Sequence, residues 1–154
     1  MLSVWRLCAV RRAHGAFSGE GAARFGGRWN EKGVRLVYAA MSLSLAVVEI
    51  LVHADELPQD FVAIRADIPT GVKLERLRAA SLPRNWRRYP APAQLRAIGT
   101  TWVHAGRALA LQVPSAVIPQ ETNLLINPAH PDMRRVVVHK PERFSFDRRL
   151  KRLR

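Results

Sequence analysis

The segment SLSLAVVEILVHA, residues 42–54, constrains the fold of this chain more than any other part of the sequence. Ser42 is a plausible helix N-cap, and residues 43–54 are apolar on nearly every side of the helix that they predict. Because a helix of this kind belongs in the interior, the rest of the chain has to build a core around it. Glu49 is the only charged residue between Ser42 and His53, which makes its carboxylate a candidate functional group.

A carboxylate on such a helix has two explanations. Burying a charge costs several kcal/mol unless the charge is paired. A salt bridge to His53, one turn later, or to an arginine from the loop at residues 13–33 would therefore be a structural solution. The functional alternative is that Glu49 lines a pocket at the end of the helix.

The remaining pattern predicts one domain of mixed secondary structure. Its predicted elements are strands at residues 2–6, 34–40, 61–68, 108–119 with a break at Pro114, and 134–140, and a second helix at 94–106. Segments 13–33 and 121–132 are rich in glycine or turn-forming residues and predict loops. Since strands outnumber helices without βαβ alternation, we expect an α+β fold with a central β-sheet core flanked by helices. We expect one compact domain, residues 1–140, followed by a basic C-terminal tail, residues 141–154.

Charge and cysteine content limit the classes of function. The net charge of +13 is spread over many loops. Binding of nucleic acid would explain it, but so would an anionic small ligand, an acidic protein partner or a genome-wide bias toward arginine. The single Cys8 forms no internal disulfide and no signal peptide opens the chain, so we expect a cytoplasmic protein. No apolar run approaches the roughly 20 residues needed to cross a bilayer, so we expect no membrane partner.

Residues 26–30, GGRWN, place an arginine directly after two glycines. They lie within residues 13–33, which hold six of the nine glycines, and a structureless loop of that length is usually functional. The forked guanidinium of Arg28, beside glycine amides, is suited to bind a phosphate or pyrophosphate. The structural alternative is a glycine turn followed by an arginine packed on Trp29.

Other signals are weaker or absent. Tyr38, at the end of a predicted strand, and Ser115, just after Pro114, fit a core position and a local turn as well as they fit a site. GEGAAR lacks the last glycine of a dinucleotide fingerprint, and there is no Walker-type glycine loop. The histidines lack H-E-x-x-H spacing and one cysteine cannot build a thiolate zinc site, so we expect no metal.

The order of these residues resembles the RES-domain family, which is named for its Arg, Glu and Ser. The chain has an arginine in a glycine loop, a tyrosine ending the next strand, a glutamate on the following helix and a serine after Val-Pro. The matching segments are VWRL, FSGEGAARFGGRWN, LVYAA, SLSLAVVEILVH, the stretch from Ile98 to Ser115, and ETNLLINPAHPD. The resemblance covers about residues 4–140, and the motif places the family's functional positions at Arg28, Tyr38, Glu49 and Ser115.

The resemblance implies an ADP-ribosyltransferase-like fold and an enzymatic toxin. Such proteins are toxins of bacterial type II toxin–antitoxin systems and cause growth arrest or death by depleting NAD. They cleave its nicotinamide N-glycosidic bond by hydrolysis or phosphorolysis, with water or inorganic phosphate as acceptor. NAD is then a substrate, and no cofactor is expected. The implied partner is an Xre-type helix-turn-helix antitoxin that blocks the pocket and contacts operator DNA, with a homodimer of the toxin allowed within that complex.

Under this hypothesis each site residue handles one part of the dinucleotide. Arg28 holds the pyrophosphate or a nearby ribose, and Trp29 packs beneath it. Glu49 accepts a hydrogen bond from the nicotinamide ribose and stabilises the positive charge that develops there. Tyr38 packs against the nicotinamide end, and Ser115 positions the ribose or the carboxamide.

We also expect Asn127 and His130, in NPAHP, at the rim of the substrate site.

Two alternative functions stay open. The same pocket would serve a protein ADP-ribosyltransferase. A basic nucleic-acid-binding module is the alternative from another class, motivated by the charge and the four tryptophans, but it lacks a recognisable recognition helix or aromatic ladder.

Overall fold

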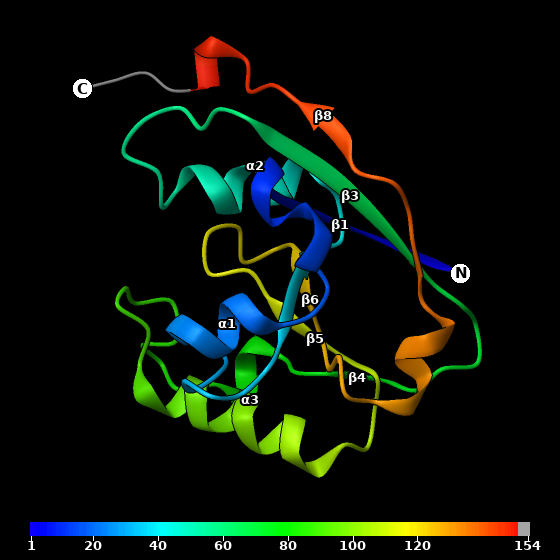
Figure 1. Ribbon diagram of the computed structural model, residues 1–154. Helices are drawn as coiled ribbons and strands as arrows, with labels where there is room; N and C mark the ends of the chain where they lie inside the picture. Colours follow the sequence, from blue (N-terminus) through cyan, green and yellow to red (C-terminus); the bar gives the residue numbers. More distant parts are fainter. Residues whose placement is uncertain (151–154) are drawn as a thin grey trace.

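The computed structural model describes residues 1–150, whose strands form one mixed sheet (Figure 1). The strands are β1 (Leu2–Ala9), β2 (Val37–Ala40), β3 (Phe61–Ile68), β4 (Leu74–Arg76), β5 (Ala110–Pro114), β6 (Thr122–Ile126), β7 (Val137–Val138) and β8 (Glu142–Phe144). Their order is β4-β5-β6-β2-β1-β3-β7, and β8 also pairs with β3. Among these described strands, β4 and β5 run parallel and every other pair is antiparallel. The predicted α+β class is confirmed.

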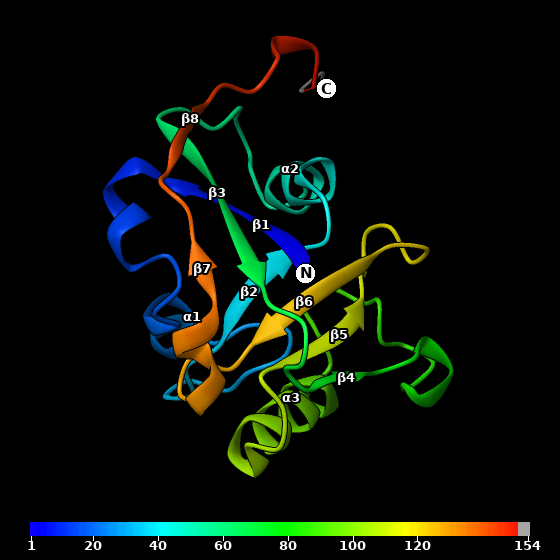
Figure 2. The same cartoon turned by 90° about the vertical axis from the view of Figure 1, so that its right-hand side faces the viewer.

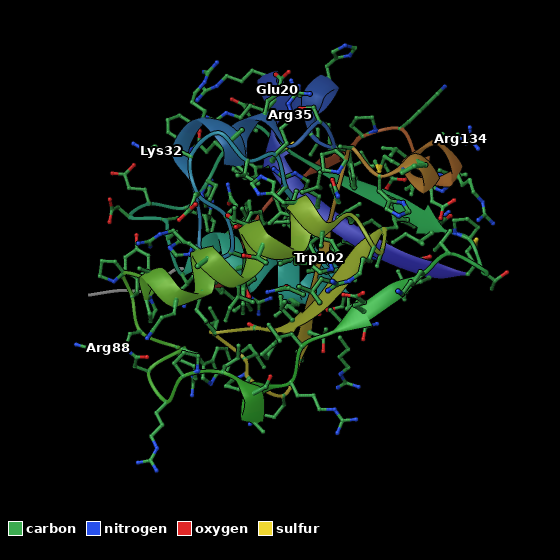
Figure 3. The ribbon with its side chains drawn as sticks, turned by 90° about the horizontal axis from the view of Figure 1, so that it is seen from below. Glu20, Lys32, Arg35, Arg88, Trp102 and Arg134 are labelled. Carbon is green, nitrogen blue, oxygen red and sulfur yellow. The ribbon has the colours of Figure 1, made fainter. Side chains whose placement is uncertain are left out.

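The α-helices of the described chain are α1 (Glu20–Phe25), α2 (Leu43–Leu51) and α3 (Ala93–Ala105). Figure 2 shows α2 beside the upper part of the sheet and α3 below it. Leu95 and Trp102 of α3 are buried against Leu111 and Leu125 of β5 and β6, and Trp102 is labelled in Figure 3. None of the helices in residues 1–150 combines the length and the hydropathy that a membrane span needs.

Helices α2 and α3 cover one face of the sheet at different ends of β2. Leu36, just before β2, packs in the cluster around α3, and Ala40, at its end, packs with α2. Because side chains alternate along an extended chain, Leu36, Tyr38 and Ala40 share one face. Tyr38 therefore lies between the two helices, where the candidate site is found.

Helix α2 begins as predicted, but it is shorter and its C-terminal end is more exposed than expected. The Ser42 hydroxyl accepts a hydrogen bond from the backbone N–H of Leu45 at 3.1 Å, which confirms the N-cap. The helix ends at Leu51 and not at residue 54. Val52, which follows it, is 54% exposed, because this side of the helix borders a cavity instead of the core.

Two segments predicted as loops contain regular structure. Residues 13–33 include α1, which ends at Phe25 and is capped by Gly26, a glycine with a φ of 70°. Residues 121–132 include β6, which pairs with β2 on one side and with β5 on the other. A central position in the sheet thus makes a strand of a segment whose flanking residues favour turns.

The strands predicted after Pro114 are shorter than expected. β5 ends at Pro114, and bends and a turn replace the second strand expected up to residue 119. The strand predicted at 134–140 is reduced to the two residues of β7, because a 3₁₀ turn, Pro131–Arg135, precedes it. Proline accounts for the first difference, since it removes a donor from the ladder.

The C-terminal segment 141–154 contributes to the sheet over the part that the structure describes. Its strand β8 pairs with β3, and the Phe146 side chain lies edge-on to Phe61 with ring centroids 5.6 Å apart. Phe146 is buried next to α2. Residues 151–154, the end of the expected basic tail, lie outside the described residues.

Candidate active site

A cavity of about 1030 Å³ is lined by parts of β2, α2 and residues 25–29. Four of the predicted site residues line it: Arg28, Trp29, Tyr38 and Glu49. Its charged wall residues are four arginines and one carboxylate: Arg6, Arg12, Arg28, Arg87 and Glu49. This excess of positive charge suits an anionic ligand. Within residues 1–150, no three His, Cys, Asp or Glu side chains are grouped to hold a metal ion.

The two glycines of GGRWN let the loop close tightly against β2. The backbone N–H of Gly26 donates to the Ala22 carbonyl at 2.8 Å and ends α1. A Cβ on Gly27 would lie 2.7 Å from the Tyr38 hydroxyl oxygen, too close for any side chain at that position. The close approach that Gly27 permits is therefore to Tyr38, and it provides a structural reason for the glycine that needs no ligand.

The Arg28 side chain is oriented by backbone carbonyls. Its Nη1 donates to the carbonyl oxygens of Trp86 at 2.7 Å and Arg88 at 3.2 Å, whereas Nε and Nη2 have no protein acceptor within residues 1–150. Burial lowers the pKa of Arg28, and the negative charge of Glu49 opposes that shift. The Trp29 side chain is only 3% exposed and packs in the core, and its packing beneath Arg28 stays a prediction.

Tyr38 joins β2 to the GGRWN loop. Its hydroxyl donates to Asn30 Oδ1 at 2.6 Å and accepts from the backbone N–H of Trp29 at 3.0 Å. Burial raises the pKa of Tyr38, so its phenol stays neutral. Asn30 is fully buried and donates in turn to the carbonyls of Ala22 and Val34. The Tyr38 ring lines the cavity while its hydroxyl is used to hold the loop.

The Glu49 carboxylate is bound through one oxygen. Oε1 accepts hydrogen bonds from the Ser115 hydroxyl and from Asn123 Nδ2, each at 2.6 Å. Oε2 has no protein donor within residues 1–150, and Glu49 forms no ion pair there, so the salt bridge to His53 or to an arginine is absent. The carboxylate is thus oriented by two neutral donors and keeps one oxygen for a ligand of the cavity.

Ser115 contacts the Glu49 carboxylate but does not line the cavity. The serine is 0% exposed, and its hydroxyl oxygen accepts from the backbone N–H groups of Val117 at 3.1 Å and Ile118 at 3.0 Å while it donates to Glu49. The sequence placed Ser115 on the substrate. The structure makes it a positioning residue for the carboxylate.

Two cavity residues lie in the matching segments VWRL and ETNLLINPAHPD but are not singled out as site residues by the sequence. Arg6, on β1, donates from Nη1 to the Tyr38 carbonyl at 2.6 Å, and its buried Nε has no partner within the described chain. Burial lowers the pKa of Arg6. Asn123, on β6, pairs in register with Ala40, which brings it beside Glu49. Asn123 lies in the ETNLLIN segment, but only the strand register reveals its contact.

Asn127 and His130 do not lie at the rim of this cavity. Asn127 is buried, donates from Nδ2 to the Val103 carbonyl at 3.3 Å and accepts from the N–H of Ala129. His130 Nδ1 accepts from the backbone N–H of Asp132 at 3.1 Å. Both side chains satisfy the backbone of their own turn or of α3, which is a common role of such residues in a turn.

Comparison with known proteins shows relatives along nearly the whole chain. The family model of the RES domain matches residues 3–147. A protein of Sphingobium sp. (strain YBL2) named Prs ADP-ribosylating toxin is 39% identical over 154 residues, which cover 96% of each protein. Toxin Res of Yersinia enterocolitica is 37% identical over 153 residues, which cover 97% of this chain and 100% of that protein.

The fold also occurs in a solved structure. A chain in the crystal structure of the M. tuberculosis MbcT–MbcA toxin–antitoxin complex matches with a TM-score of 0.74 and 18% identity, over 93% of this chain and 84% of that chain. At this identity the likeness concerns the fold alone. Together with the family match and the sequence relatives, these findings lead to one conclusion: the chain belongs to the RES domain family.

Proposed function

We propose that the chain is the toxin of a type II toxin–antitoxin system and that it depletes NAD by cleaving the nicotinamide N-glycosidic bond. The observation that carries the proposal is the hydrogen bonding of the Glu49 carboxylate. One carboxylate oxygen is held at 2.6 Å by Ser115 and Asn123, and the other is unpaired within residues 1–150, in a cavity that Arg28 also lines. The names of the curated relatives, which are toxins over the same length, support the biological role.

The proposed reaction needs charge stabilisation more than proton transfer. When the bond between the nicotinamide nitrogen and C1′ of its ribose breaks, the electron pair leaves with nicotinamide, which departs as a neutral molecule. Positive charge develops on the ribose, and a fixed carboxylate beside it lowers the barrier. An oxygen of water or inorganic phosphate then bonds to C1′ and gives ADP-ribose or its phosphorylated form, with the proton of water passing to solvent.

The wall of the cavity offers a group for each part of this substrate. Arg28 has two free donor nitrogens, Nε and Nη2, and the Nη2 of Arg6 also has no protein acceptor within residues 1–150. These donors suit the pyrophosphate. The Tyr38 ring gives an apolar wall near the nicotinamide ribose. Ser115 and Asn123 hold the carboxylate in place before the substrate arrives, so that its orientation costs nothing during the reaction.

We further propose an antitoxin partner of the Xre helix-turn-helix type. It would cover the cavity and block substrate entry, and it would contact operator DNA on behalf of the complex. A homodimer of the toxin is allowed within that complex. The shared fold with a chain of a toxin–antitoxin complex supports an antitoxin partner. Co-expression followed by gel filtration tests the pair, and an antitoxin that forms no complex would reject it.

The reaction is tested with the purified chain free of antitoxin. We expect nicotinamide to be released from NAD, and mass spectrometry of the other product, in buffers with and without phosphate, separates hydrolysis from phosphorolysis. NAD that stays intact for hours in both buffers would reject the proposal.

Transfer of ADP-ribose to a protein is the second candidate. The observation that favours it is the name of the Sphingobium relative, Prs ADP-ribosylating toxin, at 39% identity. In this reaction a nucleophilic side chain of a target protein takes the place of water at C1′. Mass spectrometry of proteins treated with the chain and NAD would show a mass increase of one ADP-ribose unit, and its absence would leave free NAD cleavage as the activity.

A further inference from the structure

A second cavity, of about 570 Å³, adjoins the first. The residues that line both cavities are Phe25, Gly26, Gly27, Arg28, His53 and Tyr89. Arg28 therefore lies at the junction, while Glu49 lines the first cavity and not the second. Binding clefts for small molecules typically measure about 300–1,000 Å³, so each cavity has room for one half of a dinucleotide.

Two large rings at the junction are exposed without a structural reason. Phe25, the last residue of α1, is 64% exposed, and Tyr89 is 76% exposed. The Tyr89 ring lies 5.3 Å from the His53 ring, and its hydroxyl has no hydrogen bond within residues 1–150. Neither Phe25 nor Tyr89 packs in the core clusters of the described chain. Rings of this kind beside a polar cleft are typical platforms for a nucleobase.

Half of the residues that line only the second cavity are charged. These residues are Glu31, Lys32 and Arg96, and the uncharged ones are Asn30, Pro90 and Ala91. Figure 3 places Lys32 on the same side of the molecule as Arg88, whose carbonyl accepts from Arg28. Cationic side chains suit a phosphate, and a carboxylate can accept from ribose hydroxyls.

We infer that the second cavity binds the adenosine half of the dinucleotide, with the base against Phe25 and Tyr89. The inference rests on the proposed function and assigns a position to each part of the substrate. The nicotinamide ribose lies by Glu49 in the first cavity, the pyrophosphate lies at Arg28, and the adenosine lies beyond it. The free Nε and Nη2 of Arg28, at the junction of two cavities, are what a pyrophosphate linking two nucleosides requires.

Nicotinamide mononucleotide tests this assignment because it keeps the scissile bond and lacks the adenosine. We expect the wild-type chain to have a higher kcat/KM for NAD than for the mononucleotide. In Phe25→Ala and in Tyr89→Ala, the ratio of the two kcat/KM values should fall about 10-fold, the size expected for losing one base-stacking side chain. The ratio does not depend on the fraction of folded enzyme, so a loss of folding cannot imitate the effect.

Two control variants separate ring stacking from a general effect of surface changes. Tyr89→Phe keeps the ring and should keep most of the preference for NAD. Val137→Ala removes an exposed apolar side chain of β7, outside both cavities, and should leave the ratio unchanged. A ratio that is equal in wild type, Phe25→Ala and Tyr89→Ala would overturn the inference while nicotinamide release still supported the proposed function.

Binding of ADP, measured by calorimetry, tests the same subsite without turnover. We expect ADP to bind the wild-type chain and to bind Tyr89→Ala about 10-fold more weakly. If the chain releases nicotinamide from neither substrate, the proposed function fails, and the ADP measurement still decides whether an adenosine site exists. Equal affinities, or no ADP binding by the wild type, would overturn the inference.

Discussion

Two carboxylates of this protein, Glu49 and Asp67, accept a serine hydroxyl at the same distance of 2.6 Å but differ in what their second oxygen does. Glu49 keeps Oε2 unpaired within residues 1–150. Asp67, on β3, accepts from Ser3 through Oδ1, and its Oδ2 is bonded to His139 at 2.6 Å and to Arg65 at 3.3 Å. A carboxylate bound on both sides is complete without a ligand, whereas one bound on a single side is prepared for one.

The Glu49 and Asp67 carboxylates also lie in different surroundings. Ser3, Asp67 and His139 connect β1 and β3 to the chain just after β7, and the backbone N–H of His139 also donates to the Arg65 carbonyl. Glu49 borders a cavity of about 1030 Å³. We therefore assign the Asp67 cluster to the stability of the sheet and the Glu49 cluster to the reaction.

The largest effect on turnover is expected for Glu49→Gln. This variant keeps the size of the side chain but removes the charge that stabilises the developing cation, so nicotinamide release should fall by at least about 100-fold. The midpoint of thermal unfolding should change little. Full turnover by the folded variant would remove Glu49 from the mechanism.

A smaller loss of turnover is expected for Ser115→Ala. The variant removes a hydrogen bond to the carboxylate, worth roughly 1.5 kcal/mol, so kcat should fall about 10-fold with little change in KM. Ser81→Ala is a matched control, because the Ser81 hydroxyl makes only a local bond to the Arg78 carbonyl and Ser81 lines neither cavity. A kcat equal to that of the control would contradict the positioning role.

Gly27→Ala should weaken the loop that carries Arg28. The new Cβ would lie 2.7 Å from the Tyr38 hydroxyl oxygen and 2.9 Å from Asn30 Oδ1, so the free energy of unfolding should fall by about 1–3 kcal/mol, measured in urea. We expect a rise in KM for NAD as Arg28 moves. Gly15→Ala is the control, because its Cβ would meet only the Ser18 hydroxyl oxygen, at 3.6 Å. Equal stability of both variants would contradict this account of the loop.

Asp67→Asn should change stability and leave nicotinamide release unchanged. Hydrogen bonds from Ser3 and then His139 lower the pKa of Asp67 in the folded protein. The stability that it contributes is therefore fully present above the ordinary aspartate pKa of about 3.9 and is lost as the pH falls through the lower folded value. The variant should unfold at a lower temperature than the wild type at pH 7, and the difference should shrink below about pH 4. A loss of turnover matching that of Glu49→Gln would erase the distinction between the two clusters.

Parts of the fold with a strong local signal are predictable from the sequence. Ser42 caps α2, and the alternation in FVAIRADI predicts β3 with the bounds that it has, Phe61–Ile68. β6 is missed because Asn123 and the Asn127-Pro128 pair favour turns, whereas pairing with a strand on each side stabilises it. The pairing with β2 joins segments that are far apart in the chain, so the sequence of β6 alone does not reveal it.

In the candidate site, too, residues with a strong local signal are predictable from the sequence, and residues placed only by the fold are not. Arg28 and Glu49 attract attention because each conflicts with its neighbours, a charge after two glycines and a charge on an apolar helix. Arg6 is an ordinary polar residue of a strand, and its place in the cavity depends on how β1 meets β2. Ser115 lies 66 residues from Glu49 in the sequence, so its contact with the carboxylate follows from the fold alone.

A crystal structure of the Glu49→Gln variant with NAD tests the central claim most directly. We expect the nicotinamide ribose within hydrogen-bond distance of the side chain at position 49 and the pyrophosphate on Nε and Nη2 of Arg28. NAD bound with its nicotinamide ribose away from position 49, or on another face of the molecule, would contradict it.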